Sequence, residues 1–161
     1  MIKHMRIDNR LIHGQVAAVW SNYISADAIV VCNDKVAADP IQKMALPLAA
    51  RGHKVLVMTI ADLVEYESAN PNQSLFVIAK FPTDALEVLE KIEKVEFVNV
   101  GNAAPITGTD YKMVTKSIAA TKEDAVVYRQ IADKLGGKLT TRMVPNNDEE
   151  DFLKLLAKAG F

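Results

Sequence analysis

The chain has 161 residues, of which 50% are hydrophobic and 24% charged, a composition typical of globular proteins and unlike that of disordered or fibrous chains. Its 19 basic and 20 acidic residues give a formal net charge of −1, which argues against a nucleic-acid partner. The single cysteine, Cys32, excludes an internal disulfide, and no apolar run reaches the ~20 residues of a membrane span. Because the N-terminus also lacks a signal-peptide core, we expect one cytoplasmic domain over residues 1–161.

Segments rich in β-branched residues alternate along the chain with segments of helical period. Seven strands are predicted, at Lys3–Ile7, Ala28–Cys32, Lys54–Met58, Leu75–Ala79, Glu96–Val100, Met113–Ile118 and Lys138–Met143. Runs such as Ile29–Cys32 are apolar throughout, which is typical of strands buried on both faces of a parallel sheet.

Helices are predicted between these strands from apolar periodicity and capping residues. They are expected at Val16–Tyr23, from Pro40 to about Ala50 after the cap Asp39, at Ala61–Ser68 after Thr59, at Asp84–Ile92 after Thr83, from Thr121 to Leu135, and in a last helix opened by Asn147 or Asp148. Pro47 should kink or shorten the second of them. The alternation predicts an α/β fold, an open, doubly wound, mainly parallel β-sheet with helices on both faces. In such sheets ligands bind outside the carboxyl ends of the strands.

The segment from Arg6 to Val16 follows the first predicted strand and precedes a helix, so it lies at that edge. A neutral histidine there, His13, could attack phosphorus through a ring nitrogen. Arg10 offers a fork of donors that matches phosphate oxygens. Gly14 and Gln15 would bring backbone N–H groups close to an anion, and Asp8 could orient the imidazole or anchor an arginine. These residues together suit the handling of a phosphoryl group.

Other interpretations of the same residues stay open at this stage. A lone loop histidine is more often structural than catalytic, and the other two histidines, His4 and His53, have still less support. A receiver-like module would instead accept phosphate on a strand-end aspartate such as Asp8 or Asp34. Asp34 equally suits a turn or a helix cap. A third class is a purely structural or regulatory interaction domain.

Further residues at the same edge are expected to border a pocket: Arg6, Asp34, Gly101 and Asn102. Arg6 and Asp8 would also make an ordinary ion pair at a strand end. The chain lacks the glycine-rich motifs of dinucleotide and P-loop sites, a GxSxG elbow, and clustered histidine or cysteine spacing. We therefore expect no metal and no cofactor.

The run Arg6–Val16, RIDNRLIHGQV, closely resembles the active-site signature of IIB components of the mannose/fructose/sorbose family of the phosphoenolpyruvate-dependent sugar phosphotransferase system. The similarity extends to Val31–Asp34 with Asp39 downstream, to Asn99–Asn102, and to Met143–Pro145 before the last helix. One departure is Asn9, where relatives often carry a second aspartate.

The resemblance implies a cytoplasmic phosphocarrier with an open, mostly parallel sheet. Such a protein-histidine–sugar phosphotransferase accepts a phosphoryl group from a phosphohistidine of the IIA component. It passes the group to a sugar as the membrane IIC and IID components transport that sugar, and these partners hold it at the inner face of the membrane. The family's phosphorylated histidine corresponds to His13, with Nδ1 as acceptor, and its loop arginine to Arg10. The resemblance leaves the sugar unidentified and is compatible with a homodimer.

Overall fold

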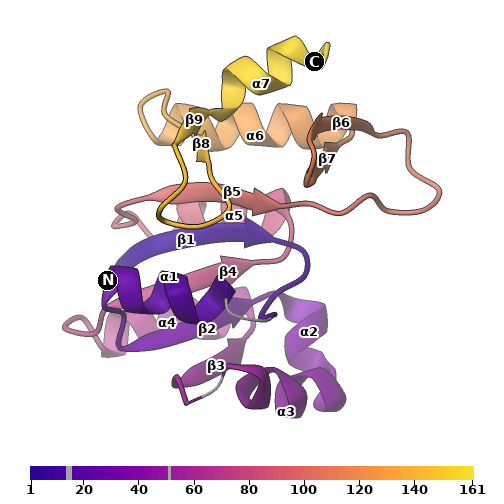
Figure 1. The fold of residues 1–161 in the computed structure, drawn as a ribbon. Helices are drawn as coiled ribbons and strands as arrows, with labels where there is room; N and C mark the ends of the chain where they lie inside the picture. Colours follow the sequence, from indigo (N-terminus) through magenta and orange to yellow (C-terminus); the bar gives the residue numbers. More distant parts are fainter. Residues whose placement is uncertain (14–15, 51) are drawn as a thin grey trace.

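A twisted seven-stranded sheet forms the centre of the computed structural model, which describes residues 1–13, 16–50 and 52–161 (Figure 1). The strands, in the spatial order β3-β2-β4-β1-β5-β8-β9, are β1 (Ile2–Asp8), β2 (Ala28–Cys32), β3 (Val55–Met58), β4 (Leu75–Ala79), β5 (Val98–Asn102), β8 (Thr140–Thr141) and β9 (Glu150–Asp151). Every neighbouring pair in this sheet is parallel except β8 with the short β9. The predicted open, mainly parallel α/β sheet is therefore confirmed.

Helices cover both faces of this sheet. They are α1 (Val16–Ile24), α2 (Asp34–Ala38), α3 (Pro40–Ala49), α4 (Ile60–Ala69), α5 (Pro82–Lys91), α6 (Lys122–Lys134) and α7 (Phe152–Lys158). Because strand side chains alternate between the faces, Val30 and Cys32 pack with buried residues of α4, α5, α6 and α7. Ile29 and Val31 pack with those of α1 and α2 on the opposite face. The two apolar clusters make the fold doubly wound, as the sequence predicted.

The helix starts agree with the sequence where a capping side chain marks them. Thr59 and Thr121 each form a capping box, with Asp62 and Asp124, and Asp39 caps α3. Two expected caps are wrong. Helix α5 begins at Pro82, before Thr83, because Asp84 accepts from the Phe81 N–H at 2.9 Å, and α7 is capped by Asp151 rather than Asn147 or Asp148. The short helix α2, capped by Asn33, was not predicted.

Two predicted strands also differ from the structure. Met113–Ile118 is not one strand: β6 (Lys112–Thr115) and β7 (Ile118–Ala120) form a separate antiparallel hairpin. Lys138–Met143 shrinks to the two residues of β8. The loop 142–149 that follows passes in front of β5 and β1 in Figure 1, on the face that carries α1. Within the described ranges, no helix is sufficiently long and apolar to cross a membrane.

Candidate active site at the β1–α1 loop

A row of polar side chains runs along β1 on the face that carries α1. His4, Arg6 and Asp8 share that face because strand side chains alternate, and all three are buried. The parallel pairing with β5 places Asn99 beside Arg6. Trp20 of α1 and the loop 142–149 cover the row, and the Trp20 indole N–H donates to the Met143 carbonyl at 3.0 Å. The polar row is therefore enclosed between the sheet, Trp20 of α1 and the loop 142–149.

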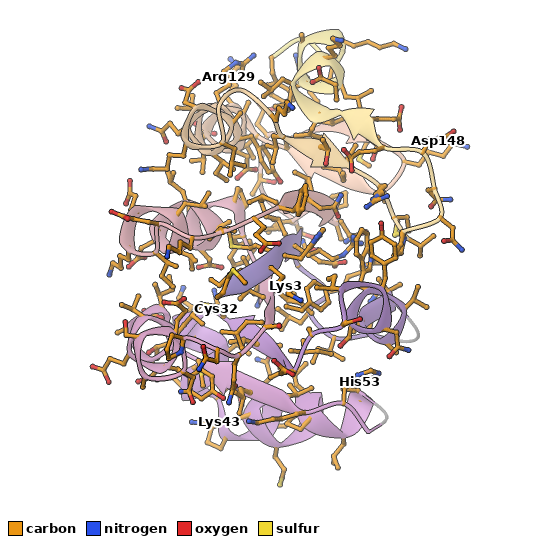
Figure 2. The ribbon with its side chains drawn as sticks, turned by 90° about the vertical axis from the view of Figure 1, so that its left-hand side faces the viewer. Lys3, Cys32, Lys43, His53, Arg129 and Asp148 are labelled. Atoms are coloured by element: carbon orange, nitrogen blue, oxygen red, sulfur yellow. The ribbon has the colours of Figure 1, made fainter. Side chains whose placement is uncertain are left out.

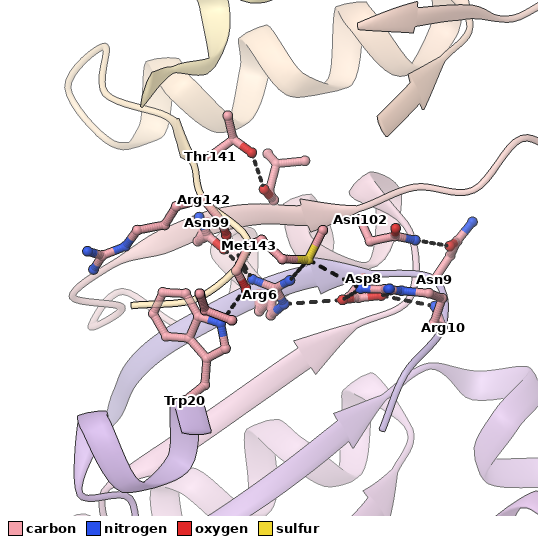
Figure 3. Close-up of polar contacts among 12 residues, drawn as sticks. Arg6, Asp8, Asn9, Arg10, Trp20, Asn99, Asn102, Thr141, Arg142 and Met143 are labelled. Atoms are coloured by element: carbon pink, nitrogen blue, oxygen red, sulfur yellow. Dashed lines mark hydrogen bonds and ion pairs between the residues drawn. The ribbon is translucent and has the colours of Figure 1, made fainter. Parts of the chain in front are cut away.

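Arg6 is the centre of this row, with a side chain only 1% exposed. Its guanidinium donates to Asn99 Oδ1 (2.7 Å), to the Arg142 carbonyl (3.2 Å) and to Asp8 Oδ2 (3.2 Å) (Figure 3). Burial lowers the pKa of Arg6, and the neighbouring carboxylate of Asp8 opposes that shift. A Cβ atom on Gly101 would overlap the Arg6 guanidinium, so any larger residue there would have to displace Arg6.

Asp8 links Arg6 to Arg10. Its Oδ1 accepts from the Arg10 backbone N–H (3.1 Å) and Nε (3.0 Å), and its Oδ2 accepts from Arg10 Nη2 (3.0 Å) and Arg6 Nε. Two parallel bonds between a guanidinium and a carboxylate fix the plane of the arginine. The Asp8 side chain is 1% exposed and that of Arg10 is 30% exposed. Arg10 is therefore held from beneath while part of its guanidinium faces solvent.

The turn between Arg10 and His13 is anchored by two apolar residues. The backbone of Leu11 has a φ of 62°, a left-handed conformation that is uncommon for residues other than glycine, asparagine and aspartate. Its N–H donates to the Asp8 carbonyl at 3.0 Å, and the side chains of Leu11 and Ile12 are buried in the apolar cluster beneath α1. This packing compensates for the cost of the left-handed conformation and fixes the position of His13.

His13 is half-buried, and its pKa lies below the ordinary value because of burial first and the positive charge of Arg10 second. The imidazole is consequently neutral at cellular pH and keeps a lone pair for nucleophilic attack. Its Nδ1 is buried and receives no hydrogen bond from the described residues. A neutral nucleophile beside a fixed guanidinium is suited to phosphoryl transfer.

Asn9 joins this loop to the end of β5. Its amide donates to the Ala104 carbonyl (2.9 Å) and accepts from the Ala104 N–H (3.0 Å). Beside Asn9 lies a cavity of about 480 Å³ between the β5–β6 loop and the first residues of α5 and α6. An aspartate at this position could not donate to the Ala104 carbonyl, so the Asn9 amide makes one bond that a carboxylate would lose.

Comparison with known proteins identifies the family. The model of the PTS system sorbose subfamily IIB component matches residues 2–161. The sorbose-specific EIIB component of Klebsiella pneumoniae is 33% identical, over 97% of this chain and 95% of that protein. The fructose-specific EIIB component of Bacillus subtilis is 29% identical, over 94% and 93%. The crystal structure of the IIBSor domain of the Klebsiella pneumoniae sorbose permease superimposes with a TM-score of 0.90 at 32% identity, covering 100% of this chain and 99% of that one. The chain belongs to the sorbose-subfamily IIB components.

As a IIB component, the chain is a phosphotransferase of a sugar phosphotransferase system. Among the residues predicted from its sequence, Asp8 and Arg10 are directly bonded, and His13 lies near enough for both charges to act on its pKa. Gly14 and Gln15 lie outside the described residues.

The expected pocket edge of this IIB component requires correction. Arg6 and Asn102 are buried and so do not form an exposed pocket edge, and Arg6 instead holds Asn99. Asp34 accepts from the Ile60 N–H at 2.9 Å and so holds the start of α4. Gly101 does line a cavity, one of about 480 Å³ that is also bordered by Met143 and the turn of the β6–β7 hairpin.

Sequence reasoning missed three residues that build the site of this IIB component. Asn99 accepts from Arg6, Trp20 covers Arg6 with its ring 5.5 Å from the guanidinium carbon, and the Met143 sulfur lies 3.8 Å from both arginines. Asn99 gave two signals, since it lies in the similar segment Asn99–Asn102 and is a polar residue between two valines in a buried strand. The other two had no signal beyond the similarity noted at Met143–Pro145.

Proposed function

We propose that this IIB component carries a phosphoryl group on His13 Nδ1. It takes the group from a phosphohistidine of the IIA component and passes it to a sugar that the membrane IIC and IID components transport. The observation that carries the proposal is the pairing of Asp8 with Arg10, which fixes the guanidinium three residues before His13. Burial and the charge of Arg10 both lower the pKa of His13, which favours its neutral, nucleophilic form. The family's phosphotransferase activity supports it.

In the first transfer, the Nδ1 lone pair forms a bond to phosphorus while the bond from phosphorus to the donor nitrogen breaks. The donor leaves as an imidazole, so the step needs positioning and charge stabilisation more than an external acid or base. The Arg10 guanidinium meets the negative charge on the transferred oxygens. Because Nδ1 is buried in this structure, the ring must turn outward before the donor can reach it.

In the second transfer, a sugar hydroxyl oxygen attacks the phosphorus and the bond from phosphorus to His13 Nδ1 breaks. The proton that the hydroxyl loses balances the one that the departing His13 ring takes up to leave as a neutral imidazole. Gly14 and Gln15 would supply backbone N–H groups to the phosphate, which stays a prediction. The mannose-specific EIIAB component of Escherichia coli, 29% identical, supports a IIA donor because its name joins A and B parts, and this chain matches 47% of its length. We expect the chain to work in the cytoplasm at the inner face of the membrane, where its partners hold it.

An acyl phosphate on an aspartate has less support from the geometry. Both oxygens of Asp8 are occupied by arginine N–H groups, and Asp34 accepts from a helix N-terminus. Because the Asp8 side chain is also only 1% exposed, a phosphoryl donor cannot reach it.

The test is acceptance of labelled phosphate from phosphoenolpyruvate through the general carriers and IIA. We expect His13→Gln to abolish labelling and His4→Gln and His53→Gln to retain it; His53 lies beside β3 and α3 (Figure 2). The bond should be labile in acid and stable in alkali, as a phosphoimidazole is. Full labelling of His13→Gln, or a bond destroyed by alkali, would reject the proposal, and a chain without any label would be an interaction domain.

A further inference from the structure

Helix α3 presents a stripe of large apolar side chains to solvent. Ile41, Met44 and Leu48 are 74%, 70% and 80% exposed, the three highest values among the large apolar side chains of the described residues. Ala45 between them is exposed too. The spacing i, i+3, i+4, i+7 places these four side chains on one face of the helix, which we call the α3 stripe.

The fold does not explain the α3 stripe. None of the ten residues of α3 is buried, and its contact with the apolar cluster beneath α1 comes from the half-buried Leu46. The stripe therefore exposes apolar side chains that could be polar without loss of the core. An exposed apolar surface of this kind marks a contact with another molecule.

The α3 stripe belongs to the same half of the molecule as the His13 loop. Leu11 and Ile12, next to His13, share one apolar cluster with Val36 of α2 and with Leu46. Because β1 and β2 run in the same direction, α2 follows β2 at the edge where the loop follows β1 (Figure 1). A partner that covers α3 thus lies on the part of the molecule that holds His13.

The area and the charge of the α3 stripe limit which kind of molecule can cover it. The α3 stripe exposes roughly a few hundred Å² of apolar surface, which is below the ~800 Å² per partner of a stable interface. The stripe can therefore be only one part of a contact, as it would be for a partner that also reaches His13. Lys43 is the only charged residue of α3 (Figure 2), whereas helices that bind lipid surfaces carry a strongly basic polar face. The stripe has the anchor spacing of a helix that docks in the apolar groove of a protein.

Two protein partners exchange phosphate with this chain under the proposed function. Charged contacts mainly speed association, whereas apolar contacts slow dissociation. An uncharged stripe therefore suits a partner to which the chain stays bound, and it suits less well the IIA component, which the chain meets only for one transfer. That partner is the membrane component that receives the phosphoryl group.

We propose that the α3 stripe docks in an aliphatic groove on the cytoplasmic face of the membrane component, with an acidic side chain there facing Lys43. This inference rests on the proposed function for the identity of the partner. Docking itself needs no phosphate, so it can be tested on the unphosphorylated chain.

The test compares Met44→Gln/Leu48→Gln with Val126→Gln, a matched change at a residue of α6 that is 57% exposed. Binding is measured to inside-out membrane vesicles that contain the IIC and IID components of the same phosphotransferase system, and to protein-free liposomes of phosphatidylethanolamine and phosphatidylglycerol. We expect the double variant to bind the vesicles at least tenfold more weakly and Val126→Gln to bind normally. Both should accept phosphate from phosphorylated IIA at the wild-type rate.

Unchanged vesicle binding by the double variant would overturn the proposal. So would slower phosphorylation by IIA, which would assign the stripe to the donor, or equal loss of binding to the liposomes, which would assign it to lipid. A wild-type dimer that the double variant dissociates in sedimentation would assign it to a second copy. If wild type accepts no phosphate, the proposed function fails, while the vesicle measurement still decides the docking surface.

Discussion

The Arg10 guanidinium has a structural side, which bonds Asp8, and a second side that is free to bind phosphate. Asp8 occupies its inner side through two parallel bonds, and its outer side reaches solvent near His13. We expect Arg10→Ala to slow transfer from phosphorylated IIA by about 10- to 100-fold, because charge-assisted bonds to the phosphate contribute roughly 1.5–3 kcal/mol. Arg10→Lys should restore part of the rate, since lysine supplies charge without the planar fork.

Rapid-quench transfer and thermal unfolding of the same Arg10→Ala sample separate the two roles. If Arg10 only holds the loop through Asp8, the melting temperature falls and the transfer rate stays as in wild type. An unchanged rate would reject the catalytic role at any stability.

The substitution Gly101→Ala tests how rigidly the Arg6 side chain is held. The added methyl group of Gly101→Ala would overlap a guanidinium that Asp8, Asn99 and the Arg142 carbonyl fix in place. Overpacking of this kind costs about 1–3 kcal/mol of unfolding free energy, which urea denaturation measures. In an Arg6→Met background the flexible thioether can move aside, so the same substitution should cost less than half as much. Equal costs in the two backgrounds would show that another contact causes the loss.

At the scale of elements, the sequence predicted helices and strands where local signals were strong. Thr59, Thr121 and Asp39 bond the N–H groups of their own first turns, a local interaction that needs no tertiary structure. The hairpin at 112–120 was missed because its turn, Lys116-Ser117, contains no glycine, proline or asparagine to interrupt a run of β-forming residues. Helix α2 was missed because five residues are too few for a helical period to emerge.

The contribution of one helix cap to stability can be measured at the start of α6. Thr121 Oγ1 accepts from the Asp124 N–H at 3.1 Å, and the Asp124 carboxylate accepts from the Thr121 N–H at 2.9 Å. Thr121→Ala leaves the first of these donors without its partner, so we expect a loss of about 1 kcal/mol in urea denaturation. Lys122→Ala, at the exposed next position, should change the stability little. Equal losses in the two variants would contradict the capping argument.

At the scale of the whole molecule, the site depends on contacts between segments far apart in the chain. The motif from Arg6 to Val16 was visible in the sequence, but the bonds that fix Arg6 reach across 93 residues to Asn99 and 136 to Arg142. Sequence periodicity reports the face on which a side chain lies and does not report which distant segment meets it. The parallel register of β1 with β5 and the path of the loop 142–149 supply that information.

The same buried polar row predicts how the stability of the molecule depends on pH. His4 packs against Trp20, with ring centroids 4.7 Å apart, and its Nε2 has no hydrogen-bond partner among the described residues. Burial first, and then the positive charges of Arg6 and Arg142, lower its pKa from 6.5 to about 3.

The unfolded chain therefore binds a proton at His4 below pH 6.5 that the native chain binds only near pH 3. The contribution of His4 to the free energy of unfolding is therefore fully present above pH 6.5. It falls as the pH drops, by about 2 kcal/mol between pH 7 and pH 5. His13, whose pKa is also lowered, acts in the same direction, and Asp84, whose pKa burial raises, opposes it. Urea denaturation of wild type and His4→Phe isolates His4, because phenylalanine keeps an aromatic ring and has no titrating group. Between pH 7 and pH 5 the free energy of unfolding of the variant should fall by about 2 kcal/mol less than that of wild type. Equal falls in the two proteins would show that His4 is protonated in the native state or contributes nothing to the pH dependence.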